Sequence, residues 1–355
     1  MQKKVFECSI DYIQVMDENG NIDANLMPKD VDDNKIVEMY KYMLFARNLD
    51  SKTLSLQRQG RADTFAPLLG EEASQIGVAF AMRKDDYLIP AFRQHGIYLA
   101  RGLPIKSYFL YWKGFEEGNA TAKSINALPI IVPVATQMPH GAGVAFTQKY
   151  LGSSNVAVAY VGDGGTSEGD FYEAINFAGV NKLPFIAIIE NNQWAISIPR
   201  NKQTAAETLA QKAVAVGIKG VQVDGNDVIG VYKVVKDAID NSKNGPTLIE
   251  CVTYRMSMHT TADDPTKYRS DSEVKAWVEK DPLKRVKIYL VKKGLWNDDL
   301  EKKTTEEQLA QIDKAVEEAE TFKEDPRSMF ENIYSFMPEV LKEEEDSAIA
   351  ANFWQ

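Results

Sequence analysis

The sequence contains few cysteines and no long apolar run. Its two cysteines, Cys8 and Cys251, are far apart and form no CxxC pair, so neither a disulfide framework nor a zinc site is expected. Cys251 lies in an apolar run and is most simply a buried core thiol. No apolar stretch reaches membrane-spanning length, and the first residues lack the pattern of a targeting segment. These absences predict a cytoplasmic protein without a membrane partner.

The chain also lacks an excess of basic residues. Lys and Arg together number 41 against 51 Asp and Glu, which gives a formal net charge of −10 at pH 7. This balance disfavours nucleic acids and anionic membranes as the main partners. A polyanionic ligand could still bind, but only where a metal ion or local cations offset the repulsion between like charges.

The pattern of polar and apolar residues divides the 355 residues into three parts. Residues 1–32 are polar and turn-rich, and we expect an extended N-terminal arm. Residues 33–271 alternate helical patterns with short apolar runs, which predicts an α/β domain with a doubly wound, mostly parallel sheet and helices on both faces. Residues 272–355 are charged, and we expect a C-terminal helical extension.

The most informative segment spans residues 156–197 and has the sequence VAVAYVGDGGTSEGDFYEAINFAGVNKLPFIAIIENNQWAIS. It contains two apolar runs separated by a glycine turn and a helical pattern. Asp163 follows the first run and Asn192 the second, a separation that suits one right-handed βαβ unit. Because such a unit brings the carboxyl ends of its strands together, both side chains are expected at the edge where open α/β sheets bind ligands.

The residue types in this turn suit a diphosphate held with magnesium. Gly164 and Gly165 allow backbone N–H groups to approach a bulky anion. A helix is expected from about Thr166, with its positive end directed at the same place. Asp163 and Asn192 would offer a carboxylate and an amide oxygen, and magnesium prefers one or two carboxylates completed by phosphate and other oxygens. The metal would also offset the charge conflict.

Two other nucleotide-binding motifs fail on their spacing. A Rossmann fingerprint requires glycine where Ser167 stands, and a P-loop requires lysine where Asp170 stands. The simplest alternative is an ordinary glycine turn between strand and helix, with Asn191 and Asn192 in a plain loop. On local sequence alone this alternative stays open.

The segment resembles the thiamine diphosphate motif, a GDG turn followed by a strand that ends in NN. More narrowly, it resembles the α subunits of heterotetrameric 2-oxo acid dehydrogenase E1 components. Further segments match that family in order, namely 46–50, 57–61, 70–73, 91–96 and 259–269. The resemblance covers nearly the whole chain. It implies the thiamine diphosphate-binding fold, with thiamine diphosphate and Mg²⁺ as cofactors.

The resemblance also implies roles for single residues. Asp163, Asn192 and the carbonyl of Trp194 match the magnesium ligands. Arg93 matches the cation on the terminal phosphate, a task that suits a guanidinium group, whereas Phe92 stands where a tyrosine hydroxyl is usual. The residues that match cofactor contacts are Phe92, Arg93, Val132, Val134, Asp163, Gly164, Gly165, Asn192 and His259.

His259 matches the histidine of a mobile active-site loop, and we assign it a catalytic role. It is expected to contact the diphosphate and to handle a proton near the reacting carbon. Arg255 precedes it, and a polar loop follows, as a lid requires. A lone histidine is more often structural, which is the interpretation we keep for His95 and His140. Ala66 stands where some relatives carry a histidine near the substrate, so no substrate contact is assigned there.

Through the resemblance, the expected function is that of an enzyme subunit. The implied reaction is the thiamine diphosphate-dependent oxidative decarboxylation of pyruvate with reductive acetylation of the lipoyl group of a dihydrolipoyl acyltransferase (E2), which gives acetyl-CoA and CO₂ in the whole complex. An E1 β subunit is expected to supply the activating glutamate in an α2β2 heterotetramer. The alternatives are the α subunit of branched-chain 2-oxo acid dehydrogenase or of acetoin dehydrogenase. A non-catalytic, anion-binding regulatory subunit represents a different class.

Overall fold

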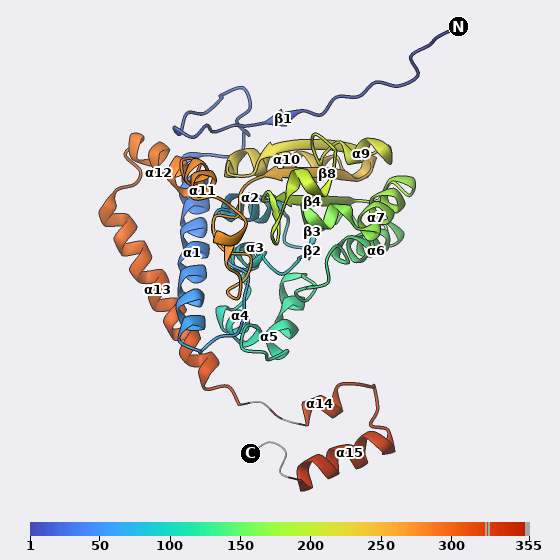
Figure 1. The fold of residues 1–355 in the computed structure, drawn as a ribbon, viewed down its shortest axis with the longest axis vertical. Helices are drawn as coiled ribbons and strands as arrows, with labels where there is room; N and C mark the ends of the chain where they lie inside the picture. Colours follow the sequence, from blue (N-terminus) through green and yellow to red (C-terminus); the bar gives the residue numbers. More distant parts are fainter. Residues whose placement is uncertain (324, 326, 352–355) are drawn as a thin grey trace.

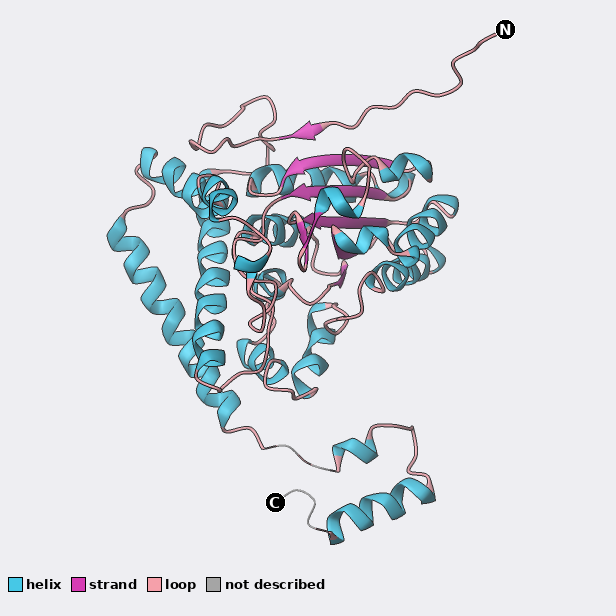
Figure 2. Ribbon diagram, viewed as in Figure 1, coloured by secondary structure: helices cyan, strands magenta, loops and turns pink. Residues whose placement is uncertain are grey.

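A six-stranded parallel sheet lies at the centre of the computed structural model (Figures 1 and 2). Its strand order is β1-β7-β8-β4-β3-β2, and every neighbouring pair is parallel. The structure describes residues 1–323, 325 and 327–351. The strands of the sheet are β1 (Tyr12–Ile13), β2 (Tyr87–Ile89), β3 (Ala157–Gly162), β4 (Phe185–Asn191), β7 (Lys219–Asp224) and β8 (Thr247–Val252).

Helices connect the strands and surround the sheet, and a short antiparallel pair lies outside it. This pair consists of β5 (Trp194–Ala195) and β6 (Ile198–Pro199). The longer helices are α1 (Asp33–Arg58), α2 (Glu72–Ala81), α6 (Gln137–Tyr150), α7 (Gly169–Val180), α10 (Val228–Asp240), α12 (Pro282–Lys292), α13 (Asp298–Glu320) and α15 (Glu339–Ala350). The shorter ones are α3 (His95–Ala100), α4 (Ile105–Tyr111), α5 (Glu117–Ala120), α8 (Arg200–Gln203), α9 (Lys212–Ala215), α11 (Asp271–Val278) and α14 (Ser328–Glu331).

Both faces of the sheet are covered, and the alternation of side chains along each strand decides which helices a residue meets. On β3, Val158 and Tyr160 belong to a core shared with α1, α2, α10 and α12. Ala157, Ala159 and Val161 belong to a second core shared with α6 and α7. Because both faces are buried, the strands carry nearly continuous apolar runs. The predicted doubly wound α/β fold is therefore confirmed.

Residues 1–32 and the described residues after α12 lie on the outside of this domain (Figure 1). In the N-terminal part, residues 12–13 pair with β7, and the backbone N–H groups of Val15 and Met16 donate to Asp227 Oδ2 at 2.6 and 2.9 Å. In the C-terminal part, α13 packs beside α1, whereas α14 and α15 lie away from the sheet (Figure 1). The division at 32/33 and 271/272 stays a prediction. No helix in the described part of the chain is long and apolar enough to span a membrane.

Candidate active site

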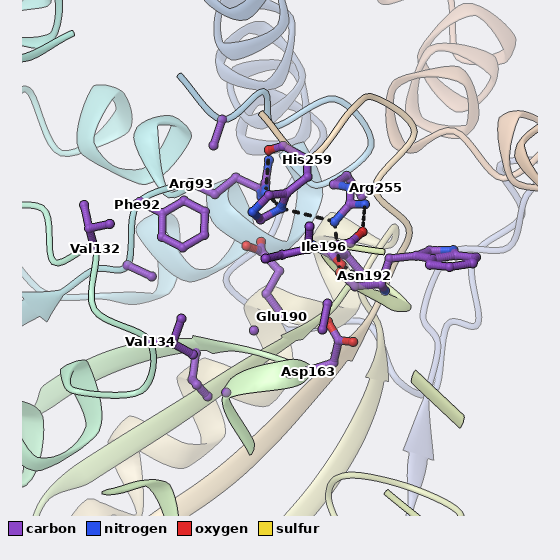
Figure 3. A pocket seen from close by; sticks show the side chains of 18 of the residues that line it. Phe92, Arg93, Val132, Val134, Asp163, Glu190, Asn192, Ile196, Arg255 and His259 are labelled. Atoms are coloured by element: carbon purple, nitrogen blue, oxygen red, sulfur yellow. Dashed lines mark hydrogen bonds between the residues drawn. The ribbon is translucent and has the colours of Figure 1, made fainter. Parts of the chain in front are cut away.

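A cavity of about 720 Å³ opens at the carboxyl ends of β3 and β4 (Figure 3). All residues that the sequence predicted as cofactor or metal contacts line it, although they come from separate parts of the chain. They are Phe92, Arg93, Val132, Val134, Asp163, Gly164, Gly165, Asn192, Trp194 and His259. The fold therefore brings together the complete predicted set, while the role of each residue stays a prediction.

Asp163 leaves the end of β3 with one carboxylate oxygen unpartnered. The side chain is 2% exposed, and among the described residues no hydrogen-bond donor reaches its Oδ2. Burial raises the pKa of Asp163 to about 6. Because a buried carboxylate oxygen without a partner is unfavourable, this atom points to a cation or donor supplied by a ligand.

The turn after Asp163 differs from the predicted helix start. A short 3-10 turn covers Gly164–Ser167, Glu168 is extended with ψ 151°, and α7 begins only at Gly169. The expectation of a helix from about Thr166 was therefore wrong by three residues. The 3-10 turn is the backbone next to Asp163. An anion bound there would therefore contact the N–H groups of this turn and not those at the N-terminus of α7.

Gly164 and Gly165 are required by close packing of this turn. A Cβ on Gly164 would come within 2.5 Å of the Ala195 Cβ, and a Cβ on Gly165 would come within 2.5 Å of Val161 Cγ2. Any larger residue would push the turn away from β3 or β5. The two glycines thus allow the backbone to lie against the cavity wall, where its N–H groups can meet an anion.

Asn192 follows β4, and its amide is held from two sides. Its Nδ2 donates to Glu71 Oε1 at 2.9 Å, and its Oδ1 accepts from the backbone N–H of Trp194 at 3.3 Å. The carbonyl of Trp194 accepts from Arg255 Nη1 at 2.9 Å. Since a carbonyl oxygen has two lone pairs, that bond leaves one acceptor position on Trp194.

Two buried guanidinium groups give this side of the cavity its positive charge. Arg93 is 4% exposed and donates to the carbonyls of Pro67 at 2.5 Å and His259 at 3.0 Å. Arg255 is fully buried and donates to the carbonyls of Trp194 and Ile196. Both groups are anchored mainly by neutral carbonyls, so their charge is available to an anion in the cavity.

His259 lies between these two arginines (Figure 3). Its Nδ1 is 3.1 Å from Arg93 Nη2 and 3.4 Å from Arg255 Nη1. Because both neighbours are donors, Nδ1 is the acceptor and the ring proton lies on Nε2. Burial and the two arginine charges lower the pKa of His259 to about 3, so the ring is neutral. The Phe92 ring packs against it edge-on, with centroids 5.9 Å apart.

The side of the cavity away from Arg255 is apolar and exposed, and its Val132 and Val134 are 53% and 55% exposed (Figure 3). Ile196, whose carbonyl accepts from Arg255, is 57% exposed. Ile196 also has a positive φ of 54°, which is unusual for a β-branched residue and concentrates backbone strain at this site. The cavity therefore has one buried polar wall and one exposed apolar wall.

Two of the buried acids in the cavity were not predicted from the sequence. Glu71 is fully buried, and Glu190 is 2% exposed and accepts from Gln94 Nε2 at 2.6 Å. Burial and the charge of Glu190 raise the pKa of Glu71 well above its usual range. A signal for Glu190 existed, because side chains alternate along a strand and residue 190 faces the same side as Asn192. Arg255 was noted only as a neighbour of the lid histidine.

The other two histidines lie outside the cavity lining. His95 is buried, with its Nε2 3.5 Å from Asp50 Oδ1. His140 is exposed on α6, and its Nδ1 lies 2.5 Å from the carbonyl of Thr136. Ala66 is buried and lines the cavity. These positions fit the structural roles predicted for both histidines.

The donor set fits a magnesium ion that is shared with a diphosphate. In residues 1–323, 325 and 327–351, no group of three or more His, Cys, Asp or Glu side chains could hold a metal ion by itself. A metal at Asp163 would therefore be completed by the Asn192 amide oxygen, a carbonyl and ligand oxygens, which is the mixture that Mg²⁺ accepts. The unpartnered Asp163 oxygen is the observation that supports this fit.

Comparisons with known proteins identify the family. The model of the family described as "Dehydrogenase E1 component" matches residues 40–327. The pyruvate dehydrogenase E1 component subunit alpha of Staphylococcus aureus is 45% identical over 342 residues, which cover 95% of this chain and 92% of that protein. The corresponding protein of Staphylococcus epidermidis is 43% identical with the same coverage. The chain therefore belongs to the dehydrogenase E1 component family, whose members depend on thiamine diphosphate.

Proposed function

We propose that the chain is the α subunit of a pyruvate dehydrogenase E1 component. It would take part in the oxidative decarboxylation of pyruvate and the reductive acetylation of the lipoyl group on an E2 partner. The relatives that carry this name match nearly the whole chain. The observation that carries the proposal is the buried Oδ2 of Asp163, which has no hydrogen-bond donor among the described residues and belongs to a cavity also lined by Arg93, Arg255 and His259.

In this proposal the buried polar wall holds the diphosphate and Mg²⁺. Asp163, the Asn192 amide oxygen and the Trp194 carbonyl would be the metal ligands. Arg93 would hold the terminal phosphate, because its guanidinium group is buried beside the cavity with its charge available. The remaining contacts to thiamine diphosphate would come from Phe92, Val132, Val134, Gly164, Gly165 and His259.

His259 would act at the reacting end of the cavity. When bound, thiamine diphosphate supplies the electron sink for loss of CO₂ from a 2-oxo acid. His259 is neutral and carries its proton on Nε2, so it can donate a hydrogen bond to an oxygen of the substrate. Arg93 and Arg255 hold the ring through Nδ1, which keeps this tautomer and orientation.

The exposed apolar wall supports an obligate partner. Val132 and Val134 are more than half exposed at the cavity, so a bound cofactor and a second chain could cover them together. We assign this role to an E1 β subunit in an α2β2 heterotetramer, and the lipoyl domain of E2 would be the second partner.

Cys251 is buried as predicted and Cys8 is exposed, and both are free thiols, which fits the reducing cytoplasm.

A substrate competition tests the proposal. The chain is assembled with its β partner, Mg²⁺, thiamine diphosphate and a lipoyl domain. Turnover of pyruvate is then compared with that of branched 2-oxo acids and of acetoin. We expect the highest kcat/KM for pyruvate. A preference for a branched 2-oxo acid or acetoin would reassign the substrate. An assembly that binds no thiamine diphosphate would contradict the proposed enzymatic activity.

A further inference from the structure

The floor of the cavity contains a contact between a buried acid and a candidate metal ligand. Glu71 immediately precedes α2 and is fully buried, and its Oε1 accepts from Asn192 Nδ2 at 2.9 Å. On the other side, the N–H of Trp194 donates to Asn192 Oδ1 at 3.3 Å. A flipped amide would place its NH₂ group against the Trp194 N–H and its oxygen against the carboxylate. Both hydrogen bonds would then be lost, so the two neighbours together select one orientation.

Orientation matters here because only one end of an amide can bind a cation. Mg²⁺ takes oxygen ligands, and the NH₂ group of Asn192 would repel it. We propose that Glu71 is a positioning residue, which keeps the Asn192 amide turned so that Oδ1 is presented to Mg²⁺. Glu71 acts through Asn192 and does not touch the ion. This inference rests on the proposed cofactor site.

The complete burial of Glu71 makes its position informative. Its Oε1 is 3.7 Å from Arg93 Nε, and no donor in the described part of the chain reaches its Oε2. A fully buried carboxyl group with one oxygen unpartnered costs desolvation free energy that an apolar side chain would not. Such a local conflict is expected where a residue serves the site and not the core. Orienting Asn192 is the task that the contacts give it.

A second asparagine–glutamate pair, formed by Asn191 at the end of β4 and Glu250 on β8, provides a matched control. Asn191 Nδ2 donates to Glu250 Oε1 at 2.7 Å, and Glu250 on β8 is 1% exposed. Its Oε2 accepts from the backbone N–H of Ala210 and from Gln222 Nε2, both at 2.9 Å. Neither Asn191 nor Glu250 lines the cavity. The two pairs thus share their chemistry and burial, but only one of them faces the proposed ion.

The test is isothermal titration calorimetry of Mg²⁺ into the full chain, assembled with its β partner at saturating thiamine diphosphate. Glu71→Leu removes the acceptor and should weaken Mg²⁺ binding by about 10- to 100-fold, the usual effect of losing a residue that orients a metal ligand. Glu71→Gln also removes the carboxyl group but retains an amide oxygen as acceptor, so it should bind Mg²⁺ nearly as the unchanged chain does. The Glu250→Gln control should leave Mg²⁺ affinity unchanged.

An exchange of donor and acceptor keeps the test decisive if Glu71→Leu fails to fold. Asn192→Asp places two carboxylates face to face. Adding Glu71→Gln supplies an NH₂ donor and restores a pair of one carboxyl group and one amide, with the two positions exchanged. We expect Glu71→Gln to raise Mg²⁺ affinity by about 10-fold or more in the Asn192→Asp background, but to change it little in the unchanged chain.

The outcomes separate the inference from the proposed function. Equal Mg²⁺ affinity in Glu71→Leu and Glu71→Gln, or the same effect of Glu71→Gln in both backgrounds, would overturn the positioning role while the cofactor site stands. If the unchanged assembly shows no Mg²⁺-dependent binding of thiamine diphosphate, the proposed function fails and the inference fails with it. Thermal unfolding of each variant without ligand separates a loss of metal affinity from a loss of structure.

Discussion

Two aspartates at the same edge of the sheet have opposite surroundings. Asp163 follows β3 and Asp224 ends β7, and each precedes a glycine. Asp224 Oδ2 accepts from Arg285 Nη1 at 2.7 Å and from Gln14 Nε2 at 2.8 Å, and its Oδ1 accepts from the Asn226 N–H at 2.9 Å. In the described residues, Asp163 Oδ2 has no such partner. The hydrogen bonds of Asp224 are all made within the chain, whereas Asp163 Oδ2 can be paired by a ligand in the cavity.

The partners of Asp224 come from the two ends of the chain. Gln14 belongs to the N-terminal arm, and Arg285 belongs to α12 in the C-terminal part. These segments lie at the β7 side of the sheet edge (Figure 1). The cavity opens at the β3–β4 side. The carboxyl edge of a parallel sheet therefore becomes structural or functional according to which flanking segment closes it.

The largest expected effect is that of Asp163→Ala on cofactor binding. Removing the carboxylate removes the charged metal ligand, so Mg²⁺-dependent binding of thiamine diphosphate should be abolished. Stability without ligand should be kept or slightly raised, because an unsatisfied buried group is lost. Calorimetric titration and thermal unfolding measure the two quantities. Unchanged cofactor affinity would contradict the assignment of Asp163.

Asp224→Ala should show the reverse pattern. It leaves the fully buried guanidinium group of Arg285 without its carboxylate, which costs about 3–5 kcal/mol of unfolding free energy in comparable pairs. Urea denaturation of the chain measures this loss. The folded fraction should bind thiamine diphosphate as before, since Asp224 does not line the cavity. A loss of cofactor affinity at full stability would break the comparison between the two aspartates.

His259→Ala tests the role of the loop that carries His259 at the cavity. We expect acyl transfer to the lipoyl group to fall by about 100-fold, the lower end of general acid–base contributions, while cofactor binding stays largely intact. Stopped-flow kinetics of acyl transfer and calorimetry separate the two effects. His140→Ala, at an exposed position outside the cavity, is the control. Normal overall flux in His259→Ala would remove the catalytic role.

The sequence predicted the residues at the ends of β3 and β4 better than the residues that reach the cavity from other segments. Asp163 and Asn192 are found by spacing, because a βαβ unit fixes where two strand ends meet. Glu71 and Arg255 reach the cavity from segments whose approach depends on tertiary packing, which no local pattern encodes. The start of α7 was misplaced because the extended Glu168 interrupts an apparently continuous helical pattern. The side-chain partners and the order of the strands required the structure.

The glycines after the two aspartates give a smaller contrast. A Cβ on Gly164 would meet the Ala195 Cβ at 2.5 Å, and a Cβ on Gly225 would meet the Val252 carbonyl oxygen at 2.9 Å. Each substitution by alanine should cost about 1–3 kcal/mol through overpacking. Only Gly164→Ala should also weaken thiamine diphosphate binding, because it displaces the turn that contacts the diphosphate. Each 1.4 kcal/mol of lost binding free energy raises Kd roughly 10-fold. Equal cofactor affinities in the two variants would show that the turn tolerates displacement.

The smallest expected effect is the pH dependence contributed by His259 in the ligand-free chain. Its pKa is lowered to about 3 in the folded state by burial, Arg93 and Arg255, against an ordinary value near 6.5. Below pH 6.5 the unfolded state therefore binds the extra proton, and stability is lost as pH falls toward 3. Between pH 8 and pH 6 the loss is roughly 0.8 kcal/mol. Buried acids such as Asp163, whose pKa is raised to about 6, gain stability over the same interval, so the His259 contribution is the change in the unchanged chain minus the change in His259→Ala. Urea denaturation of both chains at both pH values measures this difference. An equal change with pH in the two chains would mean that the His259 ring is not held neutral by its two arginines.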